Sequence, residues 1–210
     1  MRAIDWYFDF ISPYAYFAFL RLDELPPGIE VRLRPLLFAG LLNHWGQKGP
    51  AEIPAKRIWT YRACAWTAQS LGIPFRSPAA HPFNPLPYLR LALAAGCTPA
   101  AVRTIFESIW TTGADPSDSS VVAALAERLA LPMAALDAAT TKQALRANTE
   151  AAAAAGVFGV PTLLIDGELF WGVDGMDFAK AFIADPTILA SEEMRRIDTL
   201  PVAASRPAAG

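Results

Sequence analysis

The stretch Phe8-Asp9-Phe10-Ile11-Ser12-Pro13-Tyr14-Ala15 decides the fold, because a strand ends in it and a helix begins in it. From residue 4 to residue 10, apolar side chains alternate with Asp5, Tyr7 and Asp9, which is the period of two that is typical of a strand. Ser12 is a residue type that caps helices, and Pro13 suits the first helical position. Residues 29–34 alternate in the same way and predict a second strand. The chain therefore opens with a β-α-β unit, whose helix provides the crossover between two parallel strands.

The middle of the chain, from about residue 38 to 155, is predicted to be helical, because strand signals almost vanish from it. Pro, Gly and Ser or Thr separate the helices that we expect there, over residues 56–71, 86–95, 99–110, 117–130 and 140–155. The Pro-rich segment 77–87 is predicted to be a loop.

Strand signals return near the C-terminus, at residues 162–165 and 168–171. Asp166-Gly167 between them is a strong signal for a hairpin turn. A last helix is expected over residues 176–184. The pattern β-α-β … β-β-α predicts an α/β fold with one thioredoxin-like mixed sheet and a large all-helical insertion. The predicted parts are a discontinuous sheet domain of residues 1–37 and 156–200, a helical insertion of residues 38–155 and a disordered tail of residues 201–210.

The composition excludes several classes of protein. The net charge of −2 argues against a general surface for nucleic acid or anionic membranes. No apolar run approaches the roughly 20 residues that span a bilayer, and the first ten residues do not resemble a signal peptide. Cys64 and Cys97 are the two cysteines, so we expect buried thiols in a reducing compartment. We therefore predict a soluble cytoplasmic protein. With two histidines and no paired C-x-x-C, we predict no metal site.

Two segments far apart in the sequence resemble the halves of a thioredoxin-type active site. Such sites place C-x-x-C at the start of the first helix and an X-Pro bond, usually cis, against it. Here the segments are Ser12-Pro13-Tyr14-Ala15 and Phe158-Gly159-Val160-Pro161-Thr162. Because Ser12 and Ala15 stand at the cysteine positions, disulfide exchange is excluded.

With residues 8–14 and the helical middle, these segments resemble the 2-hydroxychromene-2-carboxylate isomerases. That family consists of glutathione-dependent enzymes of aromatic compound degradation. It is related to kappa-class glutathione transferases and, more distantly, to DsbA-type oxidoreductases. The likeness covers the chain to about residue 185.

The resemblance implies that Ser12 is the catalytic residue and holds the sulfur of glutathione as a thiolate. A helix N-terminus favours an anion, and the hydroxyl adds a donor. The alternative is a plain helix cap. It also implies that a cis bond between Val160 and Pro161 turns the N–H and C=O of Val160 toward the cysteinyl backbone of glutathione. The alternative is an ordinary proline at the start of a strand.

The resemblance further implies that Trp171-Gly172-Val173-Asp174 flanks the tripeptide, with Asp174 taking its γ-glutamyl ammonium group. The alternative for Asp174 is a cap of the last helix. The family usually continues with Arg, but Gly175 follows here. Lys56 resembles a lysine near the glutathione carboxylate in kappa-class enzymes, with an exposed helix-start lysine as the alternative.

Substrate-binding residues are harder to assign. Asn43, Arg62 and Asn84 are candidates for gripping a substrate carboxylate or hydroxyl. We expect His81 to be a solvated loop residue, with a general acid as the alternative. We expect the tryptophans of the middle segment to pack the helical block, and they are Trp59, Trp66 and Trp110.

The resemblance thus implies an isomerase that interconverts 2-hydroxychromene-2-carboxylate and trans-o-hydroxybenzylidenepyruvate, or a related aryl 2-keto acid, with glutathione unconsumed. Members of this group are commonly homodimers. Two alternatives stay open: a kappa-like glutathione transferase or peroxidase, and a non-catalytic thioredoxin-like binding module.

Overall fold

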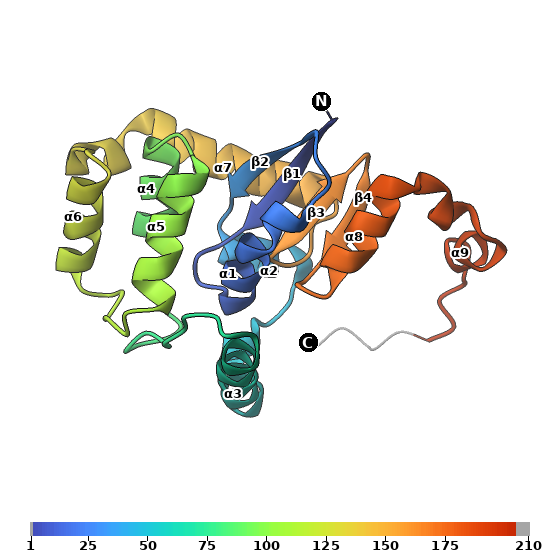
Figure 1. The fold of residues 1–210 in the computed structure, drawn as a ribbon, viewed down its shortest axis with the longest axis horizontal. Coiled ribbons are helices and arrows are strands. Elements are labelled where there is room, and N and C mark those ends of the chain that lie inside the picture. Colours follow the sequence, from blue (N-terminus) through green and yellow to red (C-terminus); the bar gives the residue numbers. More distant parts are fainter. Residues whose placement is uncertain (1, 205–210) are drawn as a thin grey trace.

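The centre of the protein is one four-stranded sheet, seen in a computed structural model that describes residues 2–204 (Figure 1). Its order is β2-β1-β3-β4. The strands are β1 Arg2–Phe8, β2 Ile29–Pro35, β3 Thr162–Ile165 and β4 Glu168–Trp171. β1 pairs parallel with β2 and antiparallel with β3, which pairs antiparallel with β4. The two ends of the chain form one mixed sheet, which confirms the predicted fold class.

Helices make up most of the remaining described chain. The α-helices are α1 Pro13–Leu20, α2 Phe38–Trp45, α3 Pro54–Leu71, α4 Leu86–Ala94, α5 Pro99–Trp110, α6 Ser119–Arg128, α7 Ala139–Ala154, α8 Gly175–Ala184 and α9 Glu192–Ile197. Short 3-10 turns lie between them, and these are η1 Leu22–Glu24, η2 Pro50–Glu52, η3 Met133–Asp137 and η4 Pro186–Ala190.

The predicted hairpin turn joins β3 to β4. Asp166 and Gly167 both have positive φ angles, 52° and 93°, as a two-residue turn of type I′ requires. The turn fixes the register that places Leu163 opposite Phe170, and both side chains are buried. On its other side Leu163 lies opposite Trp6 of β1, so the hairpin completes the core that β1 begins.

The two faces of the sheet carry separate apolar cores. Trp6 and Phe8 of β1 belong to a large core that includes residues of α1, α5 and α8. Tyr7 points to the opposite face and belongs to a smaller core with Leu41 of α2 and Ala152 of α7. The sheet is therefore covered by helices on both faces (Figure 1).

Phe106 of α5 connects the helical insertion to the sheet. Its ring is 4.6 Å from that of Phe10 and 5.7 Å from that of Phe8, between ring centroids. On α1 the nearest ring is that of Phe19, at 5.5 Å. Aromatic side chains from β1, α1 and α5 thus form one continuous cluster, which holds the insertion against the start of α1.

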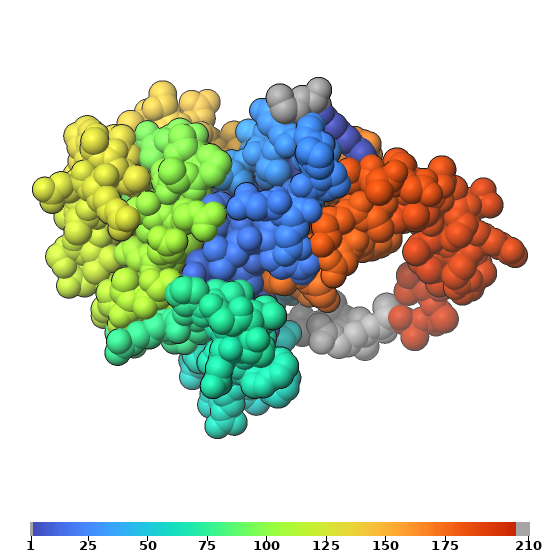
Figure 2. Space-filling view, in the orientation of Figure 1, coloured from blue at the N-terminus to red at the C-terminus, as the bar shows by residue number. Residues whose placement is uncertain are grey.

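Helix α3 projects from the rest of the molecule and forms the lower ridge in Figures 1 and 2. Cys64 and Ala68 are its buried residues, whereas Trp59 and Trp66 are 69% and 70% exposed. The prediction that these two tryptophans pack the helical block is wrong. Polar and apolar residues are spread around α3, and its buried side is the narrow one that carries Cys64 and Ala68. Trp110, by contrast, is buried.

Helices α2 and α9 were not predicted. The first turn of α2 is capped by groups distant in sequence: the N–H of Phe38 donates to Asp9 Oδ2 at 2.9 Å, and that of Leu37 donates to Thr149 Oγ1 at 3.1 Å. No local capping residue marks the start of α2, so the sequence pattern gave no signal there.

The proposed division into two domains stays a prediction. Helix α7, assigned to the insertion, contacts the sheet: Asn148 donates to the C=O of Pro35 at 3.0 Å, and Ala152 packs in the core with Tyr7. Of the predicted disordered tail, residues 201–204 have no regular secondary structure, and residues 205–210 lie outside the described part. None of the helices described is both long and apolar enough to cross a membrane.

Candidate active site

Ser12 caps helix α1 and keeps a hydrogen for another partner. Its Oγ accepts the N–H of Ala15 at 3.2 Å, and its backbone C=O accepts those of Ala15 and Tyr16. A hydroxyl that accepts through oxygen can still donate its own hydrogen. Pro13 has no N–H, so the Ser12 hydroxyl and the N–H of Tyr14 are the donors left at this positive end of the helix dipole.

Three side chains fix the loop that precedes Ser12 by hydrogen bonds. From within, Asp9 is fully buried and accepts the N–H groups of Ile11 and Phe38 at 3.1 and 2.9 Å. From the helical insertion, Trp110 Nε1 donates to the C=O of Phe10 at 3.0 Å. His81 Nε2 donates to the C=O of Ile11 at 2.7 Å. The backbone on either side of Ser12 is thereby held in place before any ligand binds.

Burial controls the acidity of Asp9. Desolvation raises the pKa of this carboxyl from 3.8 to about 7, although the N–H groups of Phe38, Ile11 and Phe10 act in the opposite direction. Asp9 is therefore a buried group that exchanges its proton close to neutral pH.

The segment before β3 carries a cis peptide bond between Val160 and Pro161. Pro161 accepts the N–H of Gly172 through its C=O at 2.9 Å, and Gly159 accepts the hydroxyl of Thr162 at 2.8 Å. Within residues 2–204, neither the N–H nor the C=O of Val160 forms a hydrogen bond. Both groups remain free to pair with an extended peptide.

The turn between β4 and α8 places Asp174 beside this segment. Gly172 has a φ of 87°, which favours glycine, and its N–H is held by Pro161. Asp174 occupies the N-cap position of α8, but among residues 2–204 its exposed carboxylate forms neither a capping hydrogen bond nor an ion pair. The Asp174 carboxylate is therefore free for an external cation. The next residue, Gly175, lies so close to the backbone of Phe170 that a Cβ would meet its carbonyl carbon at 3.2 Å.

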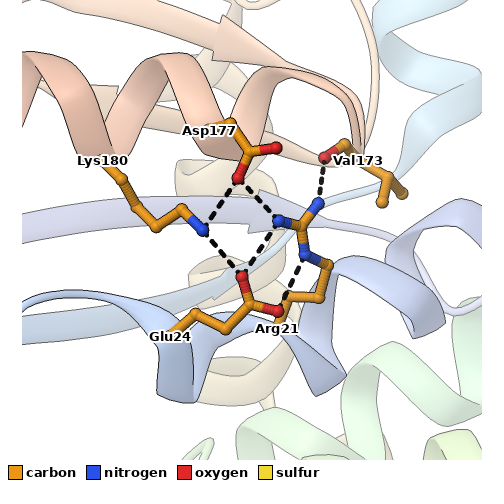
Figure 3. A network of polar contacts seen from close by, with 5 residues as sticks. All are labelled: Arg21, Glu24, Val173, Asp177 and Lys180. Carbon is orange, nitrogen blue, oxygen red and sulfur yellow. Dashed lines mark hydrogen bonds and ion pairs between the residues drawn. The ribbon is translucent and has the colours of Figure 1, made fainter.

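Arg21 anchors this turn from the end of α1. Its guanidinium donates to the C=O of Val173 at 3.1 Å and pairs with Glu24 and Asp177 (Figure 3). Lys180 closes the network by pairing with the same two carboxylates, each at 2.8 Å. The hydrogen bond from Arg21, followed by that from Lys180, lowers the pKa of Glu24 to about 2.

Two further aromatic groups border the site. The rings of Phe158 and Trp171 lie 5.3 Å apart and are both exposed, with Trp171 over Gly159. Tyr14 lies between α3 and the β4–α8 turn: burial, then Cys64, then Asp174 raise the pKa of its phenol to about 12. Tyr14 therefore stays protonated at neutral pH. Tyr14 was not among the predicted site residues, although it lies inside the Ser12-Pro13-Tyr14-Ala15 segment.

The remaining predicted residues form no hydrogen bond or ion pair with this group in the described part of the chain. Lys56 is exposed on the first turn of α3 and Arg62 is exposed further along it, while Asn43 is exposed on α2. Asn84 accepts the N–H of Leu86 at 3.1 Å, next to the start of α4. Their assignments stay predictions.

A second feature, missed by the sequence analysis, is a cleft of about 520 Å³ between α3 and the loop that precedes α4. Its polar walls are Arg57, Tyr61 and His81, and the buried Trp110 lies behind His81. His81 is half-buried and hydrogen-bonded through both ring nitrogens, so the expectation of a solvated loop histidine is wrong. Its partners come from α3 and the β1–α1 loop, which no local pattern connects with it.

The chain is similar to known proteins over most of its length. A family model described as a DSBA-like thioredoxin domain matches residues 3–184. The 2-hydroxychromene-2-carboxylate isomerase of Sphingobium xenophagum is 29% identical over 195 residues, covering 88% of this chain and 99% of that protein. The enzyme of the same name from Pseudomonas putida is 30% identical over 181 residues, covering 81% and 89%.

Glutathione s-transferase kappa 2 of Caenorhabditis elegans is 26% identical over 209 residues, covering 88% of this chain and 92% of that protein. Among solved structures, a 2-hydroxychromene-2-carboxylate isomerase superposes with a TM-score of 0.74 at 23% identity, covering 95% of this chain and all of that one. The structural likeness supports the fold, and the sequence likeness carries the family relationship.

Proposed function

The chain belongs to the family of DSBA-like thioredoxin domains and, within it, to the 2-hydroxychromene-2-carboxylate isomerases, and from this membership we propose that it is a glutathione-dependent isomerase. The proposed reaction interconverts 2-hydroxychromene-2-carboxylate and trans-o-hydroxybenzylidenepyruvate, or a related aryl 2-keto acid. The observation that carries the proposal is the Ser12 hydroxyl, which caps α1 and still has a hydrogen to donate at the helix N-terminus.

Three features of the chain fit glutathione. Ser12 and the N–H of Tyr14 offer donors to a thiolate, where the helix dipole also favours negative charge. Val160 offers an unpaired N–H and C=O to an extended peptide backbone. Asp174 offers a carboxylate without a partner to an ammonium group. Lys56 completes the proposed set as a cation for a glutathione carboxylate.

Bound glutathione would supply a thiolate that adds reversibly to the unsaturated keto acid, permits rotation about the former double bond and leaves unchanged. Ser12 would stabilise negative charge on the sulfur by donating its hydrogen, which lowers the pKa of a thiol. Trp171, Gly172 and Val173 would shape the groove along the tripeptide. Arg21 keeps that turn in position through the C=O of Val173. The chain's own residues would thus bind and orient glutathione and the substrate, and glutathione would provide the nucleophile.

Calorimetric titration with glutathione tests the first half of this proposal. We expect saturable binding, and weaker binding of S-methylglutathione, because its sulfur cannot become a thiolate. An assay of the chromene carboxylate with catalytic glutathione then tests the second half. Absence of binding at millimolar glutathione would contradict the proposal and favour a binding module of another specificity.

A kappa-like transferase is the second candidate, because a relative of that name aligns along nearly its whole length. The two functions differ in the fate of the sulfur. An isomerase leaves the concentration of free glutathione unchanged after many turnovers, whereas a transferase consumes one glutathione for each product. Measuring free thiol at the end of the reaction separates them.

We also propose a homodimer located in the cytoplasm, as the family resemblance implies. Light scattering coupled to size-exclusion chromatography measures the mass in solution. A mass of one chain, 22.7 kDa, across the accessible concentrations would contradict the dimer.

A further inference from the structure

The cleft beside α3 combines a cation, two polar rings and a short apolar segment. Arg57 lies half-buried in it and forms no ion pair with a carboxylate among residues 2–204. Tyr61, one helical turn further along α3, lies beside it. The ring of Trp110 is buried behind that of His81, 5.5 Å away between centroids, and the exposed Ala79 and Pro82 give the cleft its apolar side.

The cleft is connected with the proposed active site by hydrogen bonds to the loop that precedes Ser12. His81 Nε2 donates to the C=O of Ile11 at 2.7 Å, and Trp110 Nε1 donates to the C=O of Phe10 at 3.0 Å. Both carbonyls belong to the two residues that precede Ser12. A ligand in the cleft would therefore contact His81, one of the two side chains that hold the Ser12 loop.

We propose that this cleft binds an aryl carboxylate, with Arg57 and Tyr61 as the carboxylate partners and the exposed Ala79 and Pro82 as apolar contacts of its ring, and that His81 couples occupancy of the cleft to the Ser12 loop. An arginine without an ion-pair partner matches a carboxylate in charge and geometry. The cleft is lined mostly by Pro, Ala and aromatic residues around these few polar groups, as small-molecule sites commonly are. This inference rests on the proposed function, because the substrate of the isomerase is an aryl carboxylate.

The hydrogen bonds of His81 explain how the coupling works. A carbonyl only accepts, so Nε2 must carry a proton, and in the neutral ring Nδ1 accepts the single hydrogen of Tyr61. When the ring is charged, Nδ1 donates to the oxygen of Tyr61 at 2.7 Å, and the phenol hydrogen becomes free for a carboxylate or for the C=O of His81. Binding of an anion therefore favours the charged ring.

The charges around the ring agree with this account. His81 faces Arg57 and Tyr61 from α3, the C=O of Ile11 from the β1–α1 loop, and uncharged rings of Trp110 and Phe83. Burial is the main cause that lowers the pKa of His81; the hydrogen bond to Ile11 opposes it, and Arg57 adds to the lowering. A carboxylate that neutralises Arg57 removes part of this effect, so binding should be accompanied by proton uptake.

The test uses trans-cinnamate as the probe and its neutral amide as the matched ligand, both without glutathione. We expect cinnamate to bind at least tenfold more tightly than the amide. Arg57→Gln should lose that preference and Arg57→Lys should retain part of it, while Arg128→Gln, an exposed arginine on α6, should behave as wild type. Calorimetry in two buffers of different ionisation enthalpy should reveal proton uptake in wild type and none in His81→Gln.

Each contrary result has a definite meaning. Equal affinities for cinnamate and its amide, or full affinity in Arg57→Gln, would overturn the proposal. Loss of binding in Arg62→Gln but not in Arg57→Gln would move the carboxylate site to the exposed part of α3. Proton uptake that persists in His81→Gln would remove His81 from the coupling. Because glutathione is absent, failure of glutathione binding leaves these results interpretable, and the reverse also holds.

Discussion

At the scale of single residues, the Ser12 hydroxyl has two separable tasks. It accepts a backbone N–H of α1, and we propose that it donates to the glutathione thiolate. Ser12→Ala should cost about 1 kcal/mol of stability, the usual effect of losing a cap. It should also raise the pKa of bound glutathione by roughly one unit, because the thiolate loses a donor. Ultraviolet titration of the bound thiolate measures the second effect.

Ser12→Thr is the matched control, since threonine keeps both the cap and the hydroxyl. Its thiolate titration should follow that of wild type. If Ser12→Ala left the titration unchanged while lowering stability, the residue would be a helix cap alone.

Asp9 gives stability an unusual dependence on pH. Its pKa is about 7 in the folded chain and 3.8 for an ordinary aspartate, so between these pH values the folded state holds a proton that the unfolded state has released. Stability is therefore lost as pH rises through this window and is constant above it. We expect the free energy of unfolding to fall by a few kcal/mol from pH 4.5 to 7.5, since one pKa unit corresponds to about 1.4 kcal/mol.

Urea unfolding of wild type and Asp9→Asn at several pH values checks this expectation. The difference between the two proteins should vary across the window, because the variant has no carboxyl to titrate. Asp198→Asn, at an exposed position, serves as the control. A parallel pH dependence in wild type and Asp9→Asn would show that Asp9 does not titrate there.

The family resemblance pointed to Ser12, Val160 and Asp174, whose roles stay predictions; each lies next to the start of a helix or strand, and the sequence indicates that start locally. Sequence reasoning could not reach the roles of Asp9 and His81. Their partners, Phe38 in one case and Ile11 and Tyr61 in the other, are far away in sequence. Hydrogen bonds of this kind depend on how elements pack, which no local pattern records.

At the scale of elements, the network of Arg21, Glu24, Asp177 and Lys180 ties α8 and its preceding turn to the end of α1 (Figure 3). Exposed ion pairs contribute little, typically about 0.2–1 kcal/mol. Lys180→Gln should therefore lower the free energy of unfolding by at most about 1 kcal/mol, and 1 M salt should remove the difference.

Arg21→Gln should do more, because it also loses the hydrogen bond to the C=O of Val173. The Gly172-Val173-Asp174 turn would then be less firmly held, and we expect a severalfold weaker affinity for glutathione in calorimetry. Lys180→Gln should bind glutathione as wild type does. Equal affinities in both variants would mean that the turn keeps its position without Arg21.

The elements themselves were predictable where their signals are local. Alternation indicated β1 and β2, the Asp166-Gly167 turn indicated β3 and β4, and proline with small polar residues marked most of the helix starts. Helix α2 escaped because Asp9 and Thr149 cap it from a distance. The packing of α3 was misjudged because two tryptophans suggest burial, whereas in this chain they face outward.

At the scale of the whole molecule, one aromatic cluster makes the sheet and the insertion a single folding unit. Phe106 lies at its centre, with rings from β1 and α1 around it. Phe106→Ala should lower the free energy of unfolding by about 3–5 kcal/mol, as large truncations in a core do. Urea unfolding followed by both circular dichroism and fluorescence should still give coincident transitions.

The control is Phe178→Ala, at an exposed aromatic position on α8, which should have a much smaller effect. Two separate transitions in wild type would contradict the single unit. They would instead support the independent folding of the predicted sheet and helical domains.

The two hydrogen bonds that reach from the insertion to the loop before Ser12 have a consequence for protein engineering. A designer who wished to change substrate preference would naturally graft a foreign insertion between the ends of the sheet. Trp110 and His81 belong to that insertion, yet they hold the carbonyls of Phe10 and Ile11. A chimera that exchanges the insertion without keeping both donors would therefore gain a new pocket. It would lose the two hydrogen bonds that hold the loop before Ser12 in position.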